Sequence, residues 1–270
     1  MWFIPVGGRS PFWRPHPEGV GVAGWVVVQL SSRRLWLPGD LVDRLGLFAS
    51  SVRVAGSTET LWEREALIPT GPWRKLRASR APTRWVTREF RTDRDVALVR
   101  LPRAVTQLPP ERQLNSLGDA DRYLGIDQDI PGLPTLTINP RNALLIGLHL
   151  DNWDRLPASL RHKSRNRASV NLGPVPRALL FVDLDITEGQ PSDVVPDTET
   201  TRRLLTSAKP PPAVLRLLVP PGWAYIAPTE NLVHDGGSLS FREGAIHASA
   251  LGMYRPVRGM RDVVEVSVAL

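Results

Sequence analysis

Short apolar runs separated by polar turns dominate the hydrophobic pattern of this chain of 270 residues. The runs are rich in Val, Ile and Leu, and Gly, Pro or charged residues interrupt them at short intervals. A run of about four to eight such residues between turn signals is typical of a strand rather than of a long helix. The pattern predicts strands at residues 24–30, 34–37, 96–101, 133–138, 143–150, 168–172, 178–186, 214–219, 223–226, 239–242 and 245–254.

Four segments carry helix signals instead. Asp40 follows a Pro-Gly pair and can cap a short helix over residues 40–47. The other predicted helices cover residues 109–118, 119–123 and 198–207. Many short strands with few helices predict a single domain, residues 1–270, that is mainly β with flanking helices and is arranged as a sandwich or a barrel.

The composition excludes several classes of protein. The chain has no cysteine, which excludes a disulfide scaffold, a cysteine nucleophile and metal sites built on thiolates. No apolar run approaches the roughly 20 residues that a membrane-spanning helix needs. The N-terminal sequence MWFIPVGGRS has no basic start followed by an apolar stretch, so we expect a cytoplasmic protein.

The net charge of +7 is concentrated in one part of the chain. Residues 71–103 contain ten basic and three acidic residues, and Trp73 and Trp85 lie among them. Arginines interleaved with aromatic residues can bind nucleic acid through phosphate contacts and stacking. A solvated, arginine-rich surface explains the same run, so nucleic-acid binding is only an alternative hypothesis for the function.

One motif has the residue types and spacing of a metal site. His149 and Asp151 end the apolar run at residues 143–150, and in a strand two such positions point to the same side. His234 lies 83 residues after Asp151, beyond the turn Pro-Pro-Gly222 and before an Asp-Gly-Gly sequence. Two histidines and one carboxylate form the facial arrangement that holds non-heme Fe(II).

Other readings of these histidines remain open. A His-x-acid pair arises readily by chance, and His16 with Glu18 supplies a second one in a Pro-rich loop. His149 can also be a structural residue, and His247 in the run at residues 245–254 is a rival to His234 as the distal ligand. The two aspartates of FVDLDI, Asp183 and Asp185, share a face that we expect to be solvated.

The His149-x-Asp151 pair and the distal His234 resemble the ligands of the Fe(II)/2-oxoglutarate-dependent oxygenases. That family has the double-stranded β-helix, or jelly-roll, fold of the cupin superfamily. The resemblance implies a metal-binding jelly-roll core over residues 130–255, with residues 1–129 as supporting strands and helices and residues 256–270 as a C-terminal strand. It also implies that His149, Asp151 and His234 are the catalytic metal ligands.

The same resemblance implies Fe(II), 2-oxoglutarate and O₂, with hydroxylation or a related oxidation of a small molecule or peptide. An arginine or lysine should hold the far carboxylate of 2-oxoglutarate, because a cation pairs well with it. The candidates for this role are Arg242, Arg167, Lys163 and, more remotely, Arg255. Further residues that can line the site are Asn171, Thr229, Asn231 and Trp153.

Residues 154–167 carry five basic side chains and one acidic side chain. Such charge density predicts a loop at the rim of the pocket, where it would gate access and attract an anionic substrate. Two alternative functions stay open. One is a cupin-type metal isomerase, lyase or sugar-binding module, and the other is a basic β protein that binds nucleic acid. Neither the substrate nor the oligomeric state follows from the sequence.

Overall fold

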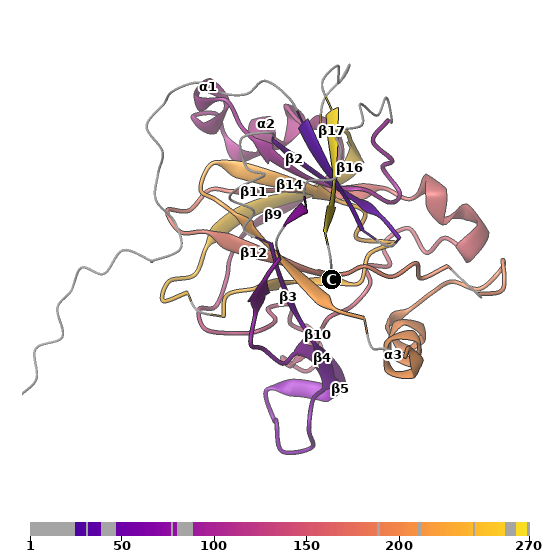
Figure 1. The fold of residues 1–270 in the computed structure, drawn as a ribbon. Coiled ribbons are helices and arrows are strands. Elements are labelled where there is room, and N and C mark those ends of the chain that lie inside the picture. Colours follow the sequence, from indigo (N-terminus) through magenta and orange to yellow (C-terminus); the bar gives the residue numbers. More distant parts are fainter. Residues whose placement is uncertain are drawn as a thin grey trace, which may run out of the picture.

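The computed structural model describes residues 25–30, 32–38, 47–76, 78–79, 89–187, 190–209, 212–239, 241–256 and 263–268. Strands dominate these residues and the helices are short, as the hydrophobic pattern predicts (Figure 1). The helix predicted at residues 40–47 lies outside the described residues, apart from Leu47, which begins a strand.

The largest sheet has nine strands in the order β7-β17-β1-β2-β8-β14-β11-β16-β9. Most neighbours are antiparallel, and β1–β17 and β2–β8 are parallel pairs. The bounds are β1 Trp25–Gln29, β2 Arg34–Pro38, β7 Ala78–Ser79, β8 Val96–Arg100, β9 Gly118–Gln128, β11 Asn166–Asn171, β14 Trp223–Ala227, β16 Ile246–Tyr254 and β17 Val263–Val268. Four strands of the N-terminal part, β1, β2, β7 and β8, therefore lie in the same sheet as later strands.

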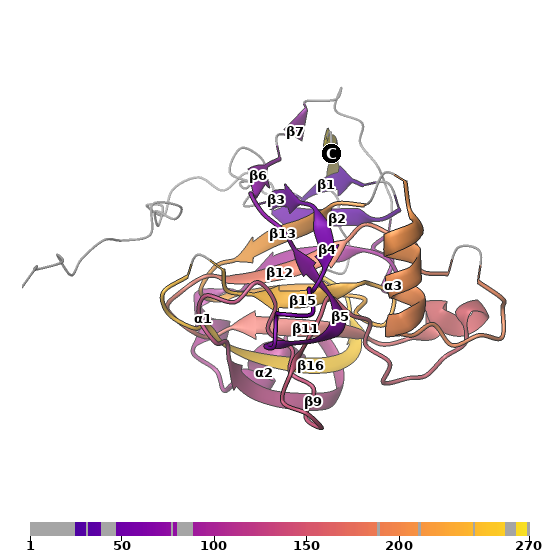
Figure 2. The ribbon, with the colours of Figure 1, turned by 90° about the horizontal axis from the view of Figure 1, so that it is seen from below.

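A second sheet has five strands in the order β15-β12-β13-β3-β6, and a third has the order β10-β5-β4. Figure 1 shows β4, β5 and β10 together at the lower edge of the molecule, and Figure 2 looks onto them from that side. The bounds are β3 Leu47–Ser50, β4 Val52–Val54, β5 Trp62–Pro69, β6 Arg74–Lys75, β10 Leu145–Gly147, β12 Arg177–Val182, β13 Val214–Val219 and β15 His234–Gly237.

The two larger sheets pack face to face. One apolar cluster joins Leu98 and Tyr225 of the nine-stranded sheet to Leu179, Phe181 and Leu217 of the five-stranded sheet. Alternate residues of β11 and β14, such as Ala168 and Ile226, point to the opposite face and belong to a separate cluster. This alternation follows from the two-residue period of a strand.

Short helices cover the outside of the nine-stranded sheet. α1 is Arg103–Thr106 and α2 is Pro110–Asn115, and α2 packs on β9, β11 and β16 (Figure 1). η2 is a 3₁₀ helix over Ala158–Lys163, and α3 covers Thr198–Ser207, as predicted. The Asp197 side chain caps α3 by accepting a hydrogen bond from Thr200 N (2.8 Å).

In the described part of the chain, no helix combines the length and apolar character needed to span a bilayer.

The chain passes between the two large sheets repeatedly from β9 onward. β9, β11, β14 and β16 lie in the nine-stranded sheet, and β12, β13 and β15 lie in the five-stranded sheet. Just after β10 the chain is joined to β15, because His149 and His234 form an antiparallel bridge. Four strand positions thus stand side by side on each side of the sandwich, in the orders β9-β16-β11-β14 and β10-β15-β12-β13.

Three predicted elements are wrong. Residues 119–123 are part of β9 and not helical, because pairing with β16 overrides their weak helix signal. Residues 133–138 form only an isolated bridge from Ile138 to Leu145: Pro134 interrupts the segment, and Thr137 N donates to Asp235 Oδ1 (3.1 Å). Residues 239, 241 and 242, the described part of the predicted strand at 239–242, are not in a strand, and the strand is the short His234–Gly237 segment before them.

Candidate metal centre

His149 and His234 face each other across two chain segments that run antiparallel. His149 N donates to His234 O (3.0 Å), and His234 N donates to His149 O (2.9 Å). Residues that exchange both backbone hydrogen bonds are directly opposite, so their side chains leave the sheet on the same side. The two imidazole rings accordingly lie with their centroids 4.9 Å apart.

A glycine allows the chain to reach this position. Gly147 has φ of 74°, and a Cβ there would lie 2.5 Å from Leu67 O of β5. Such a backbone conformation and such a close approach are available only to glycine. Gly147 also supplies the carbonyl oxygen that contacts His149 Nδ1 at 2.9 Å. The sequence before the histidine therefore fixes both its backbone and its ring.

Asp151 lies two residues beyond His149, past the end of β10, and its carboxylate faces the His149 ring. Its backbone N–H donates to Thr229 O (3.1 Å), which keeps the segment beside the one that leads to His234. Asp151 Oδ1 lies 3.8 Å from His149 Nε2, and Oδ2 lies 3.8 Å from His234 Nε2. One ligand atom from each residue lies within 4.8 Å of the others, and all three side chains are buried.

Backbone carbonyls set the same tautomer in both histidines. Nδ1 of His149 contacts Gly147 O and Nδ1 of His234 contacts Leu232 O, each at 2.9 Å. A carbonyl oxygen can only accept, so each Nδ1 carries the proton and each Nε2 keeps its lone pair. Histidines that ligate a metal are oriented in this way, with the outer nitrogen donating to a carbonyl or a carboxylate.

The charge states also suit a metal. Burial raises the pKa of Asp151, but Arg167, His234 and His149 outweigh burial and hold it below its usual range. Burial lowers the pKa of His234 to about 3 although Asp151 opposes this shift, so its imidazole is neutral at pH 7. An ionised carboxylate beside a neutral imidazole is the protonation state that metal binding requires.

The dimensions of the cluster fit one ion. Three atoms within 4.8 Å of one another share a point no more than about 2.8 Å from each, and ligand movements of under about 1 Å would give normal bonds of 2.0–2.2 Å. Asp151 Oδ2 is buried and meets no hydrogen-bond geometry with the described residues, although Arg167 Nη2 lies 2.7 Å from it as an ion-pair partner. Two imidazoles and one carboxylate are the donor set of non-heme Fe(II) sites, which leave further coordination positions open.

Arg167 is the predicted clamp residue that lies closest to the cluster. Its Nη2 lies 2.7 Å from Asp151 Oδ2, and its side chain is 19% exposed. Thr229 is buried, and its hydroxyl contributes to the lowered pKa of Asp151. The structure therefore brings Arg167 and Thr229 to the three candidate ligands.

The other predicted clamp residues lie elsewhere. Arg242, Lys163 and Arg255 are all exposed, on the turn before β16, at the end of η2 and just after β16. Arg242 was expected on a strand after the distal histidine, but the chain turns there and the side chain faces solvent.

Asn171 and Asn231 are buried and bonded to the chain rather than free to meet a ligand. Asn171, the last residue of β11, donates from Nδ2 to Val175 O (2.8 Å) and Val219 O (2.9 Å). Asn231 Nδ2 donates to the carbonyls of Asp93 and Arg161, each at 3.0 Å.

His247, the rival distal ligand, is not part of the cluster. It is buried on β16, and its Nδ1 lies 3.6 Å from Asp129 Oδ1. Burial, together with Arg177 and Arg167, lowers the pKa of His247 to about 2.

Arg177, at the start of β12, is an interior cation that the sequence reasoning missed. It is 8% exposed, and it donates from Nη1 to Ser169 Oγ (2.8 Å) and lies 3.3 Å from Asp129 Oδ2. A Cβ on Gly236 would lie 3.2 Å from Arg177 Nη2. Gly236 is two residues from His234 and on the same side of β15, which is a separation of about 7 Å along a strand. The sequence signal that could have identified Arg177 as an interior residue is its spacing: Arg177, Leu179 and Phe181 are alternate residues, and Leu179 and Phe181 point inward.

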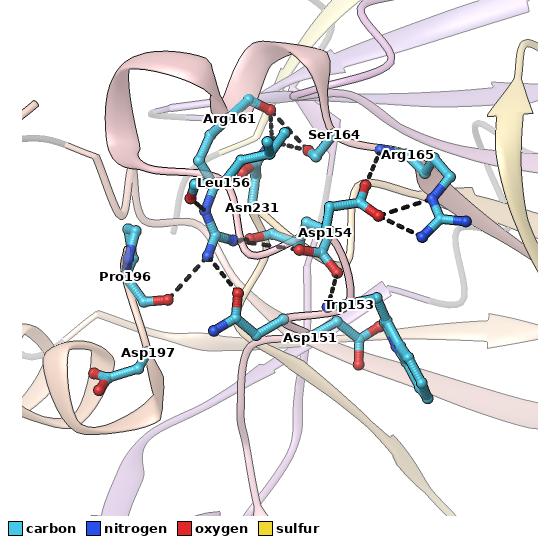
Figure 3. A network of polar contacts seen from close by, with 12 residues as sticks. Asp151, Trp153, Asp154, Leu156, Arg161, Ser164, Arg165, Pro196, Asp197 and Asn231 are labelled. Atoms are coloured by element: carbon cyan, nitrogen blue, oxygen red, sulfur yellow. Dashed lines mark hydrogen bonds and ion pairs between the residues drawn. The ribbon is translucent and has the colours of Figure 1, made fainter. Parts of the chain in front are cut away.

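The basic segment at residues 154–167 is not a free loop at the rim. Arg161 is 1% exposed and donates to the carbonyls of Leu156 (3.1 Å), Pro196 (2.9 Å) and Glu230 (Figure 3). Arg165 pairs with Asp154 and Asp121. The prediction that these two arginines attract an anion from solvent is contradicted, because carbonyls and carboxylates of the chain already hold them.

Two further predictions concern the surface. Trp153 is 45% exposed, and Arg122 lies 4.6 Å from its ring centroid, so it is not a core residue. Asp183 is not solvated as expected: its carboxylate is 4% exposed and accepts from Ser32 N (3.1 Å) and Ser32 Oγ (2.6 Å).

The basic run at residues 71–103 is described only in part, since residue 77 and residues 80–88, with Trp85, lie outside the described residues. Within the described part, Arg91 and Arg94 pair with Asp93 and Asp185. A cavity of about 190 Å³ lies near this segment and contains none of the three candidate ligands; its lining includes Arg33, Arg94, Arg161, Asp185, Thr187 and Asn231.

Comparisons of the chain with protein-family models, with curated proteins and with solved structures find no match.

Proposed function

We propose that this chain is a non-heme Fe(II)- and 2-oxoglutarate-dependent oxygenase that oxidises a small molecule or a peptide. The observation that carries the proposal is the opposed pair of His149 and His234 with Asp151 between them, within 4.8 Å. A structural histidine pair would not require both Nε2 atoms to face one buried carboxylate. Two histidines and a carboxylate with open positions favour Fe(II).

The strand connectivity supports a jelly-roll core for this enzyme. A jelly roll has eight strands in two facing sheets, which the chain enters in a fixed alternation. Here the orders β9-β16-β11-β14 and β10-β15-β12-β13 give four strand positions in each layer. His149 and Asp151 then lie just beyond the second strand, and His234 begins the seventh, which is its neighbour. The core would run from β9 to β16, somewhat earlier at its start than residue 130.

Arg177 is our candidate for the residue that holds the far carboxylate of 2-oxoglutarate. It faces the interior from β12, about 7 Å along β15 from His234, and this is comparable with the length of a five-carbon dicarboxylate. Ser169 and Ser249 lie beside it, with Ser249 Oγ donating to Ser169 Oγ (2.9 Å). Arg177 also lies 3.3 Å from Asp129 Oδ2 through its Nε, so a co-substrate carboxylate would share the guanidinium with Asp129. A guanidinium can pair with a carboxylate by two parallel hydrogen bonds.

The residues of the chain bind and orient the reactants. His149, Asp151 and His234 would hold the iron, and the Gly147 and Leu232 carbonyls keep both imidazoles in the ligating tautomer. When bound, Fe(II) would supply the activation of O₂, which converts 2-oxoglutarate into succinate and CO₂ and oxidises the substrate. Apolar residues such as Phe181 and Leu232 exclude water from the interior of the sandwich.

Iron content and succinate formation test the proposal together. We expect one Fe(II) per chain in the wild type, and loss of iron and of succinate formation in His149→Ala and in His234→Ala. The matched control is His162→Ala, because His162 is exposed on η2 and should keep both properties. Stoichiometric iron in both ligand variants would refute the site.

The same assay examines the co-substrate site. Arg177→Gln should raise the KM for 2-oxoglutarate by about 30-fold or more, since deleting one partner of a buried charge pair costs about 2–5 kcal/mol. Arg242→Leu should leave this KM unchanged, because Arg242 is exposed. Iron binding without any consumption of 2-oxoglutarate would favour a cupin-type isomerase or lyase, and salt-dependent nucleic-acid binding without iron would favour the basic β protein.

A further inference from the structure

Arg167 contacts a candidate metal ligand directly. Its Nη2 lies 2.7 Å from Asp151 Oδ2, the same oxygen that lies 3.8 Å from His234 Nε2. The guanidinium and a bound metal ion would therefore compete for the same carboxylate oxygen. An arginine cannot lose its proton in a protein, so it cannot relieve this competition by becoming neutral.

Asp151 is the only ion-pair partner of Arg167 among the residues that the structure describes. Arg167 Nε is buried and has no hydrogen-bond partner there. Another buried carboxylate near Arg167 is Glu230, which acts on the guanidinium only at longer range and forms its own ion pair with Arg161 (3.8 Å). Arg177 is a cation already paired with Asp129, and His247 lies beside that pair. When a divalent ion takes the charge of Asp151, the guanidinium loses its one direct counter-ion among the described residues and keeps only the longer-range attraction of Glu230.

We propose that Arg167 couples metal binding to anion binding at this centre, so that it opposes the metal ion until a carboxylate ligand arrives and neutralises it. The inference rests on the metal site proposed above and adds a property that the ligand set alone does not have. A cation that competes for Asp151 weakens the binding of the bare ion. The same cation strengthens the binding of the ion together with a carboxylate, because the guanidinium and the ion then share two negative groups. Coupling of this kind is reciprocal: the metal also raises the affinity for the anion.

The test measures Mn(II) affinity by calorimetry, in the absence and presence of 2-oxoglutarate. Wild type and Arg167→Gln are compared after urea unfolding has shown that both are folded. In the absence of 2-oxoglutarate, Arg167→Gln should bind Mn(II) about tenfold more tightly than the wild type, and its gain in affinity on adding 2-oxoglutarate should be about 5–150-fold smaller. A residue with a merely structural role would weaken metal binding when replaced, and this difference in sign separates the two explanations.

Two variants complete the experiment. Arg167→Lys keeps the positive charge and should bind bare Mn(II) as weakly as the wild type. Arg216→Gln is the matched control. Arg216, on β13, stacks between Phe48 and Trp73 and does not contact the candidate ligands. If Arg167→Gln binds Mn(II) no more tightly than the wild type, with an unchanged gain from 2-oxoglutarate, the coupling is refuted. If the wild type and His149→Ala bind Mn(II) equally, the metal site itself is refuted.

Discussion

Replacement of Arg161 by methionine should destabilise the protein strongly. Arg161 is 1% exposed and Glu230 is 0% exposed, and Arg161 Nη1 lies 3.8 Å from Glu230 Oε2. The guanidinium also donates to the carbonyls of Leu156, Pro196 and Glu230, so it joins η2, the segment before α3 and the chain that leads to β15. Methionine fills a similar volume but supplies none of these hydrogen bonds.

The size of the effect follows from the carboxylate that is left behind. Removing one partner of a buried ion pair costs about 3–5 kcal/mol, because the other charge stays buried without compensation. For a chain of 270 residues, an unfolding entropy of about 2.1 cal/mol/K per residue converts this loss into a fall in Tm of about 5–9 °C. The double variant Arg161→Met/Glu230→Gln should recover about 1–2 kcal/mol, since glutamine removes the buried charge and still accepts from Trp153 N.

Urea unfolding followed by tryptophan fluorescence, with calorimetry for Tm, measures these differences. Arg91→Met is the control, because Arg91 is 51% exposed and its pair with Asp93 (2.8 Å) is a surface ion pair. Such pairs contribute under about 1 kcal/mol. The reasoning fails if Arg161→Met is no less stable than Arg91→Met, or if the double variant recovers nothing.

Two further predictions concern pH and a glycine. The pKa of His247 falls from 6.5 to about 2 on folding because of burial and the nearby Arg177 and Arg167, so the unfolded chain takes up this proton first. The contribution of His247 to the free energy of unfolding is therefore complete above pH 6.5 and falls by about 1.4 kcal/mol per pH unit below it. His247→Gln should reduce the pH dependence of the free energy of unfolding by the uptake of one proton. Equal pH dependence of wild type and His247→Gln in urea titrations would contradict this. Gly147→Ala should cost more than Gly222→Ala, because both glycines have φ of 74° but only at Gly147 would the new Cβ meet a backbone oxygen at 2.5 Å. Thermal unfolding of the two variants measures the difference, which is expected to exceed about 1 kcal/mol.

Part of the fold could be predicted because its signals are local. Residues 34–38 and 96–100 alternate or run apolar over one strand length, and residues 198–207 follow a capping aspartate, so the strands β2 and β8 and the helix α3 were predictable. β9 and β15 were missed for the opposite reason. Gly118–Gln128 is largely exposed and His234–Gly237 is short and polar, so each is a strand only because a neighbour pairs with it.

The candidate ligands divide in the same way. His149 and Asp151 share a face because alternate residues of any strand do, and this needs no knowledge of the rest of the molecule. The choice of His234 over His247 as the third member depends on which strands are adjacent. The turn before His234 and the Asp-Gly-Gly after it favoured His234, while His247 lay in a strand pattern of its own. The backbone exchange between His149 and His234 brings His234 to the cluster.

The sequence by itself determined the strand-rich class and the residue types that can hold a metal, since strand period and side-chain chemistry are properties of short segments. Only the tertiary structure decided the partners of the arginines. Arg161 and Arg165 looked free in a basic segment, yet carbonyls and carboxylates from distant residues hold them. Arg167 lies against Asp151, while Arg242 faces solvent. The physical reason is that a buried charge must find its counter-ion within a few ångströms, and which groups come that close depends on the packing of the whole chain.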